Sequence, residues 1–175
     1  MNDVMLDIES LASETPNAAI VAIGAVAFDR QSQVFGPTFY RVIDMQSALN
    51  SGGEVDGKTL CWWLGQSAAV RQEISDNPNR VSHGAALADF SRFLRHCGSF
   101  EDVRVWGNGA DFDNVILKNA YTRTGVAVPW YFRNNRCFRT VRDEHPDIEF
   151  VHRGTPHRAI DDARAQVDHI LRIES

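Results

Sequence analysis

The chain has 175 residues, of which 43% are hydrophobic and 23% charged, a composition typical of a soluble globular domain. No apolar run approaches the roughly 18 residues of a membrane-spanning helix, and the N-terminus does not resemble a signal peptide. The formal net charge of −5 argues against a protein that coats nucleic acid non-specifically. The length of the chain suits one domain spanning residues 1–175. Cys61, Cys97 and Cys137 match no metal-binding spacing, so we expect a cytoplasmic protein with reduced thiols.

Three strands are predicted in the early part of the chain. Residues 4–9 are predicted to form a strand, with apolar side chains on one side and acids at its end. Residues 18–28 are rich in small and β-branched side chains, which indicates a buried central strand, and residues 34–43 alternate well enough to form a third. Because the connections are short, we expect an antiparallel three-strand start to the sheet.

The remainder of the chain alternates helical segments with a further strand. Ser82 is a candidate N-cap, Gly125 a candidate helix end, and Thr155-Pro156 resembles an N-cap followed by proline at the first helical position. Strands with helices packed around them predict an α/β domain with a mixed central sheet and flanking helices. The predicted helices span residues 58–74 (as one helix or two), 83–97, 113–124 and 156 to about 173, and the predicted fourth strand spans 103–107.

Asp7 and Glu9 are one residue apart on the first predicted strand. Side chains on a strand alternate between its faces, so both carboxylates point the same way. Two acids that share a face repel each other unless a cation neutralises them. An isolated pair of this kind is more often a solvated strand end, so it indicates a metal site only in combination with other acids.

Asp113 follows the fourth predicted strand after a glycine-rich segment. Glycines beside a strand end allow the backbone to approach a ligand closely, so Phe112 is expected to fill the core while Asp113 enters a cleft. For each acid taken alone, capping of the next helix by Asp111 or Asp113 is the simpler interpretation.

A histidine and two acids lie near the start of the last predicted helix. Histidine suits general-base catalysis, because its ordinary pKa of about 6.5 is near neutral pH. Asp162 would lie one turn beyond His157, whereas Asp161 lies four residues after the histidine and would share its helix face. Spacing alone leaves both acids open, and also leaves open a surface histidine with acids that favour the positive end of a helix dipole.

Together the motifs form a specific pattern, with Asp-x-Glu on the first strand, Phe-Asp after a later strand, and His-x-x-x-x-Asp near the C-terminus. This pattern resembles the DEDDh exonuclease superfamily, which includes ribonuclease T, oligoribonuclease and the proofreading subunits of bacterial replicative polymerases. Residues 106–117 and 157–166 are most similar to small bacterial and prophage proteins described as 3′→5′ exoribonucleases or as exodeoxyribonuclease-like. The resemblance covers nearly the whole chain and implies a 3′→5′ exonuclease with a ribonuclease H-like fold.

The resemblance assigns roles to five side chains. Asp7, Glu9, Asp113 and Asp162 match the metal-binding acids, and His157 matches the general base. Hard oxygen ligands suit Mg²⁺ or Mn²⁺, and two such ions about 4 Å apart would neutralise charge on the scissile phosphate and activate the attacking water. An acidic metal site also makes the net charge negative without excluding local contacts to phosphates.

Two segments that contact the terminal nucleotide in relatives differ in this chain. Ser10-Leu11-Ala12 stands where many relatives have threonines and a glycine, and Gly107-Asn108-Gly109 where many have His-Asn. The resemblance implies that the partner is the 3′ end of single-stranded RNA or DNA, and these two differences leave the choice of sugar open. Substrate contacts are expected from Ser10, Leu11, Asn108, Arg136, Arg139 and Arg158.

Residues 130–142 contain four arginines and no acid. Basic side chains interleaved with aromatic ones offer phosphate contacts and faces for base stacking. An equally weighted interpretation places Trp130, Phe132 and Phe138 in the core and the arginines on a solvated face.

Two further expectations concern the tryptophan pair and the overall role. Trp62 and Trp63 are interpreted as core residues, although residues 59–66 could line the cleft. A catalytically silent nucleic-acid-binding module with the same fold is the alternative to an enzyme. The full set of four acids and one histidine argues against it, because mutually repelling groups have no physical reason to be retained there. Relatives commonly form homodimers, so the resemblance also allows a homodimer of this chain.

Overall fold

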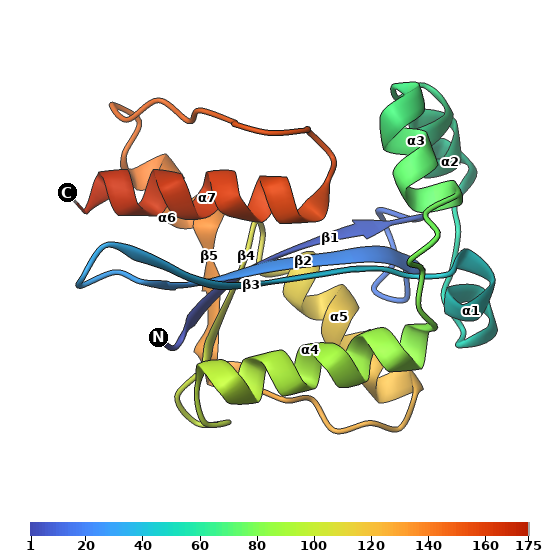
Figure 1. The fold of residues 1–175 in the computed structure, drawn as a ribbon, viewed down its shortest axis with the longest axis horizontal. Coiled ribbons are helices and arrows are strands. Elements are labelled where there is room, and N and C mark those ends of the chain that lie inside the picture. Colours follow the sequence, from blue (N-terminus) through green and yellow to red (C-terminus); the bar gives the residue numbers. More distant parts are fainter. Residues whose placement is uncertain (175) are drawn as a thin grey trace.

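The computed structural model describes residues 1–174 and is built around a five-stranded sheet (Figure 1). The strand order is β3-β2-β1-β4-β5. β2 pairs antiparallel with both β1 and β3, whereas β4 pairs parallel with β1 and β5. The mixed sheet with an antiparallel start, predicted from the sequence, is therefore confirmed. The strands are β1 (Asp3–Ser10), β2 (Ile20–Asp29), β3 (Val34–Val42), β4 (Arg104–Gly107) and β5 (Asn135–Cys137).

Helices cover both faces of the sheet (Figure 1). α7 lies on one face, and α4 and α5 lie on the other, while α2 and α3 stand beyond one end of the central strands. Among residues 1–174, no helix combines the length and the apolar character needed to cross a bilayer. The helices are α1 (Met45–Asn50), α2 (Gly57–Leu64), α3 (Ala68–Ser75), α4 (His83–Cys97), α5 (Asp113–Arg123), the 3₁₀ helix η1 (Phe132–Asn134), α6 (Phe138–Glu144) and α7 (Ala159–Ile173).

Strand β1 contributes to a separate hydrophobic core on each face of the sheet. Val4, Leu6 and Ile8 belong to the core that contains side chains of α4 and α5. Met5 belongs to the second core, with side chains of α6 and α7. Since side chains alternate along a strand, Asp7 and Glu9 continue the row of Met5 and lie on the α7 side.

Gly24 allows α7 to approach the sheet next to the acidic row. It pairs with Asp7 across the β1–β2 ladder. A Cβ at this position would lie 2.3 Å from the backbone carbon of Ala159 and 2.3 Å from the nitrogen of Ile160, so only glycine fits. The first turn of α7, which carries Asp162, is thereby held directly over Asp7.

Several predicted elements match closely and others do not. Ser82 caps α4 by accepting a hydrogen bond from the Ala85 N–H, and the 58–74 region forms two helices. The predicted start of the last helix at Thr155-Pro156 is wrong, because α7 begins at Ala159 and has no side-chain cap. No pattern in the sequence predicts α1, β5 or α6. Strand β5 and most of α6 lie within residues 130–142, for which a substrate surface and core aromatics with solvated arginines were equally expected.

Candidate active site

Three carboxylates from two distant parts of the chain converge above β1. One oxygen each of Asp7, Glu9 and Asp162 can be chosen so that all lie within 4.8 Å of one another. Asp161, the alternative to Asp162, points elsewhere. Its carboxylate accepts a hydrogen bond from the Thr155 N–H at 3.2 Å and pairs with Arg158 at 3.5 Å.

Asp113 reaches the same region from the start of α5. Its Oδ1 accepts a hydrogen bond from the Ile8 N–H at 3.2 Å, and its Oδ2 accepts one from the Asn108 N–H at 2.9 Å. Simple helix capping is therefore not its role, since these donors belong to β1 and to the loop after β4. A Cβ on Gly107 would lie 3.0 Å from the Cβ of Asp113, so this glycine leaves room for the acid.

Burial and mutual repulsion hold these acids in a state that favours their protonated forms. Burial, followed by the charges of Asp113, Glu9 and Asp162, raises the pKa of Asp7 well above its ordinary value. Burial and the charges of Asp162 and Asp113 raise the pKa of Glu9 to about 8. Burial raises the pKa of Asp113 to about 7, against the effect of its two backbone donors. The charged forms of these acids are therefore unfavourable here unless a cation compensates them.

A divalent cation fits this donor set. The four acids offer hard carboxylate oxygens, which Mg²⁺ and Mn²⁺ prefer. A cation between them would favour the charged carboxylates, which burial and repulsion disfavour, so binding would be coupled to the loss of protons. The same geometry without a cation leaves buried like charges close together, which is unfavourable.

Two side chains that the sequence motifs do not indicate fix the orientation of these acids. Gln166 is buried and donates from Nε2 to Oδ1 of Asp7 at 2.8 Å. His152 lies with its Nε2 2.8 Å from Oδ1 of Asp162. Gln166 could have been found from spacing, because it lies four residues after Asp162 and so on the same face of α7. His152 is in the loop before α7, where no periodicity signals it.

His157 lies beside this cluster in the loop that precedes α7. Its backbone adopts φ +62°, a left-handed conformation that is uncommon outside glycine. Its ring contacts the exposed indole of Trp62 edge-on, with ring centroids 4.7 Å apart. The backbone of His157 also hydrogen-bonds to Asp162 and lowers the pKa of that acid, although burial, the largest influence, raises it overall.

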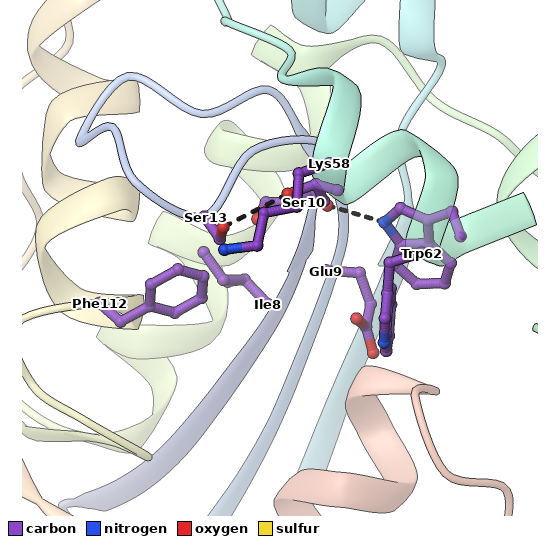
Figure 2. A pocket seen from close by; sticks show the side chains of 9 residues that line it. Ile8, Glu9, Ser10, Ser13, Lys58, Trp62 and Phe112 are labelled. Carbon is purple, nitrogen blue, oxygen red and sulfur yellow. Dashed lines mark hydrogen bonds between the residues drawn. The ribbon is translucent and has the colours of Figure 1, made fainter. Parts of the chain in front are cut away.

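A pocket of about 360 Å³ opens next to Glu9. Phe112 and Trp62 stand at opposite ends of its lining, with Ile8 and Glu9 between them (Figure 2). Trp62 is 43% exposed, so the prediction of a core role is wrong for this residue, whereas Trp63 is buried and donates from Nε1 to the Ser10 carbonyl oxygen. The remaining lining comes from Ser10, Ser13, Lys58, Thr59 and Trp63, in agreement with a cleft role for residues 59–66.

The structure separates the side chains predicted to contact substrate. Ser10 lines the pocket, whereas Leu11 is buried in the core. The backbone of Asn108 donates to Asp113, and its carbonyl oxygen accepts a hydrogen bond from Arg139 at 2.8 Å.

Two more of the predicted substrate arginines are engaged within the protein. Arg136 donates to the backbone oxygens of Arg133 and Asn135. Arg158 packs over the ring of Tyr40 and pairs with an acid of α3.

The aromatic residues of the 130–142 segment are divided between core and surface. Trp130 and Phe138 are buried, as the core interpretation predicted. Phe132 is 59% exposed, with the guanidinium of Arg133 5.6 Å from its ring centroid. Two aromatic rings of the segment are therefore packed into the protein, and one, Phe132, is directed outward.

Residues 2–173 match the family described as the 3′-5′ exoribonuclease Rv2179c-like domain. The chain belongs to this family. Membership in the Rv2179c-like family agrees with the resemblance to DEDDh exonucleases, which is confirmed. No curated protein sequence matches the chain significantly.

Solved structures of low sequence identity share the fold of this Rv2179c-like domain. E. coli exonuclease I in complex with a dT13 oligonucleotide superposes with a TM-score of 0.70 at 13% identity, over 99% of this chain and 41% of that one. The nuclease domain of 3′hExo, a DEDDh family member bound to rAMP, gives 0.64 at 13% identity, over 98% and 90%. S. pombe Pop2p in its Mg²⁺- and Mn²⁺-bound form gives 0.61 at 16% identity, over 98% and 82%. The ribonuclease H-like fold is thus confirmed, and the chain spans less than half the length of E. coli exonuclease I.

Proposed function

We propose that this protein is a metal-dependent 3′→5′ exonuclease that removes nucleotides from single-stranded RNA or DNA. The observation that carries the proposal is the convergence of Asp7, Glu9 and Asp162, with Asp113 beside them. Glu9 also lines the pocket formed with Trp62 and Phe112. Membership in a family described by exoribonuclease activity supports the same reaction. We further propose that residues 1–175 form one catalytic domain.

The metal site would consist of two divalent ions, Mg²⁺ or Mn²⁺, held by Asp7, Glu9, Asp113 and Asp162. When bound, such ions neutralise charge on the scissile phosphate, support the leaving oxygen and lower the pKa of a bound water. Gln166 keeps one oxygen of Asp7 engaged at 2.8 Å and leaves the other available as a ligand. His152 does the same for Asp162. Partners of this kind orient ligands and tune their basicity.

His157 would accept the proton of the attacking water. Its position in the loop before α7 places it beside Asp162 and against Trp62, at the boundary between the acids and the pocket. A base at this boundary can reach a water that attacks the last phosphodiester bond of a strand whose terminal nucleoside fills the pocket.

The pocket has the size and character of a site for one nucleoside. Its volume of about 360 Å³ lies at the small end of the range for ligand sites. Trp62 and Phe112 offer aromatic faces to a base, a contact that tolerates any base. Ser13 and Thr59 bring hydroxyl groups to the same lining, where they could contact the sugar. The family's description makes RNA the first substrate to test, with DNA beside it.

The test is digestion of 5′-labelled single-stranded RNA and DNA of matched sequence, with Mn²⁺ or EDTA, by wild type and Asp7→Ala. We expect a ladder that shortens from the 3′ end with Mn²⁺ only, is absent with Asp7→Ala, and is blocked by a 3′-terminal phosphate. Cleavage that persists in EDTA, or that starts within the strand, would refute the proposal. No cleavage of either strand with Mn²⁺ would also refute it.

A further inference from the structure

The side chain of Arg158 joins the His157 loop to two other elements, β3 and α3. Its guanidinium carbon lies 5.0 Å from the centroid of the Tyr40 ring in β3. Its Nε lies 3.4 Å from Oε1 of Glu73 in α3. The Tyr40 hydroxyl donates to the same Glu73 oxygen at 2.7 Å. The three side chains therefore form one connected cluster, which we call the latch.

The latch lies next to a backbone conformation that is unfavourable for most residues. His157 precedes Arg158 directly and has φ +62°, which is unfavourable for a residue with a Cβ. Such conformations persist only where the surroundings over-determine them. Arg158 also pairs with Asp161 at 3.5 Å within the first turn of α7, so its side chain is tied to the elements on both sides of the loop.

A second contact attaches the same loop to α2. The Trp62 indole of α2 meets the His157 ring edge-on at 4.7 Å. A small cavity of about 200 Å³ lies between α3 and the loop, lined among others by Val70, Glu73 and His157. The loop is thus not packed tightly against α3, and the latch and the ring contact are two side-chain attachments that it makes to the neighbouring helices.

We propose that Glu73 and Tyr40, acting through Arg158, position His157 for catalysis. This inference rests on the proposed role of His157 as general base. Neither Glu73 nor Tyr40 belongs to the acid cluster, and neither lines the pocket lined by Glu9 and Trp62. The side chain of Arg158 is not free to contact a phosphate, because its guanidinium is directed at two carboxylates and an aromatic ring within the protein.

Glu73→Gln has different kinetic effects if Arg158 belongs to the latch and if Arg158 contacts a substrate phosphate. If the latch positions the base, Glu73→Gln lowers kcat by about 10- to 100-fold and leaves KM for a single-stranded oligonucleotide within about twofold. Arg158→Gln lowers kcat similarly, and the double variant is no slower than the slower single variant, because both remove one interaction. Tyr40→Phe removes only the hydroxyl and produces a smaller loss in the same parameter.

Asp168→Asn is the matched control. Asp168 pairs with Arg172 on α7 at 3.1 Å, and the side-chain exposures of this pair, 28% and 35%, are close to the 27% and 38% of Glu73 and Arg158. Its kcat should equal that of wild type. If Glu73→Gln leaves kcat unchanged while Arg158→Gln raises KM, Arg158 contacts the substrate and the latch proposal is wrong.

A measurement independent of turnover separates the latch from the proposed function. In wild type, a nuclear Overhauser effect between the ring protons of His157 and Trp62 should be present, since the rings are in contact. It should weaken or vanish in Glu73→Gln and persist in Asp168→Asn. Persistence in Glu73→Gln would overturn the latch proposal. An inactive wild type that shows the expected Overhauser pattern would instead refute the proposed function while retaining the role of the latch in holding the ring.

Discussion

Glu9→Gln should stabilise the metal-free protein at alkaline pH while abolishing metal-dependent activity. Glu9 is 8% exposed, and its pKa is raised from 4.5 to about 8 by burial and then by the charges of Asp162 and Asp113. Ionisation of Glu9 therefore opposes folding, and glutamine keeps the shape of the side chain without the charge. The site gives up stability in order to concentrate negative charge.

The sign and the size of the effect follow from proton linkage. In the absence of metal, the native state binds the Glu9 proton more tightly than the unfolded chain, so stability falls as the pH rises between 4.5 and about 8. At about 1.4 kcal/mol for each pH unit, this interval corresponds to an upper bound on the order of 5 kcal/mol. We expect Glu9→Gln to raise the free energy of unfolding at pH 8.5 by at least ~2 kcal/mol, or Tm by about 4 to 8 °C.

The assay is urea denaturation in EDTA at pH 5 and pH 8.5. The difference between Glu9→Gln and wild type should be small at pH 5 and large at pH 8.5. Glu14→Gln is the control, because Glu14 is 79% exposed and its substitution should change stability by less than ~0.5 kcal/mol at both pH values. An equal effect of Glu9→Gln at the two pH values, or no stabilisation at pH 8.5, would refute this account of the acid cluster.

Three further substitutions separate the proposed roles of the site residues. His157→Asn should leave the thermal stabilisation by Mn²⁺ intact and lower kcat by about 10²- to 10⁴-fold, whereas loss of Mn²⁺ stabilisation would assign this residue to the metal site. Gln166→Leu should weaken Mn²⁺ binding by about 10- to 100-fold in calorimetry, because Asp7 loses its donor; unchanged affinity would contradict that role. Trp62→Ala should raise KM for an oligonucleotide by about 5- to 100-fold, and an unchanged KM would remove Trp62 from the base-binding surface.

The elements that could be predicted from the sequence are those whose local pattern and tertiary packing agree. The alternation in β1 and the small, β-branched run of β2 both describe buried strands, and Ser82 caps α4 as its residue type suggests. The start of α7 could not be predicted locally. Thr155-Pro156 has the residue types of a helix start, but the chain instead turns through the left-handed His157 before α7 begins.

Within the site, motif order carried more information than periodicity. Spacing left Asp161 and Asp162 equal, and the structure distinguishes them because Asp161 bonds back to the Thr155 N–H and pairs with Arg158. The partners of the acids could not be read from local spacing alone. His152 lies ten residues before Asp162, and Glu73 meets Arg158 across 85 residues. Such contacts depend on the way in which loops pack over the sheet.

The most direct test of the central claim is to measure Mn²⁺ binding and RNA cleavage on the same protein preparations. We predict that wild type binds Mn²⁺ in calorimetry and that its cleavage rate rises over the same range of Mn²⁺ concentration. Asp113→Ala and Asp162→Ala should lose both properties together while remaining folded. Variants that retain wild-type Mn²⁺ affinity, or that cleave RNA at the wild-type rate without binding the ion, would contradict the claim that these acids hold a catalytic metal.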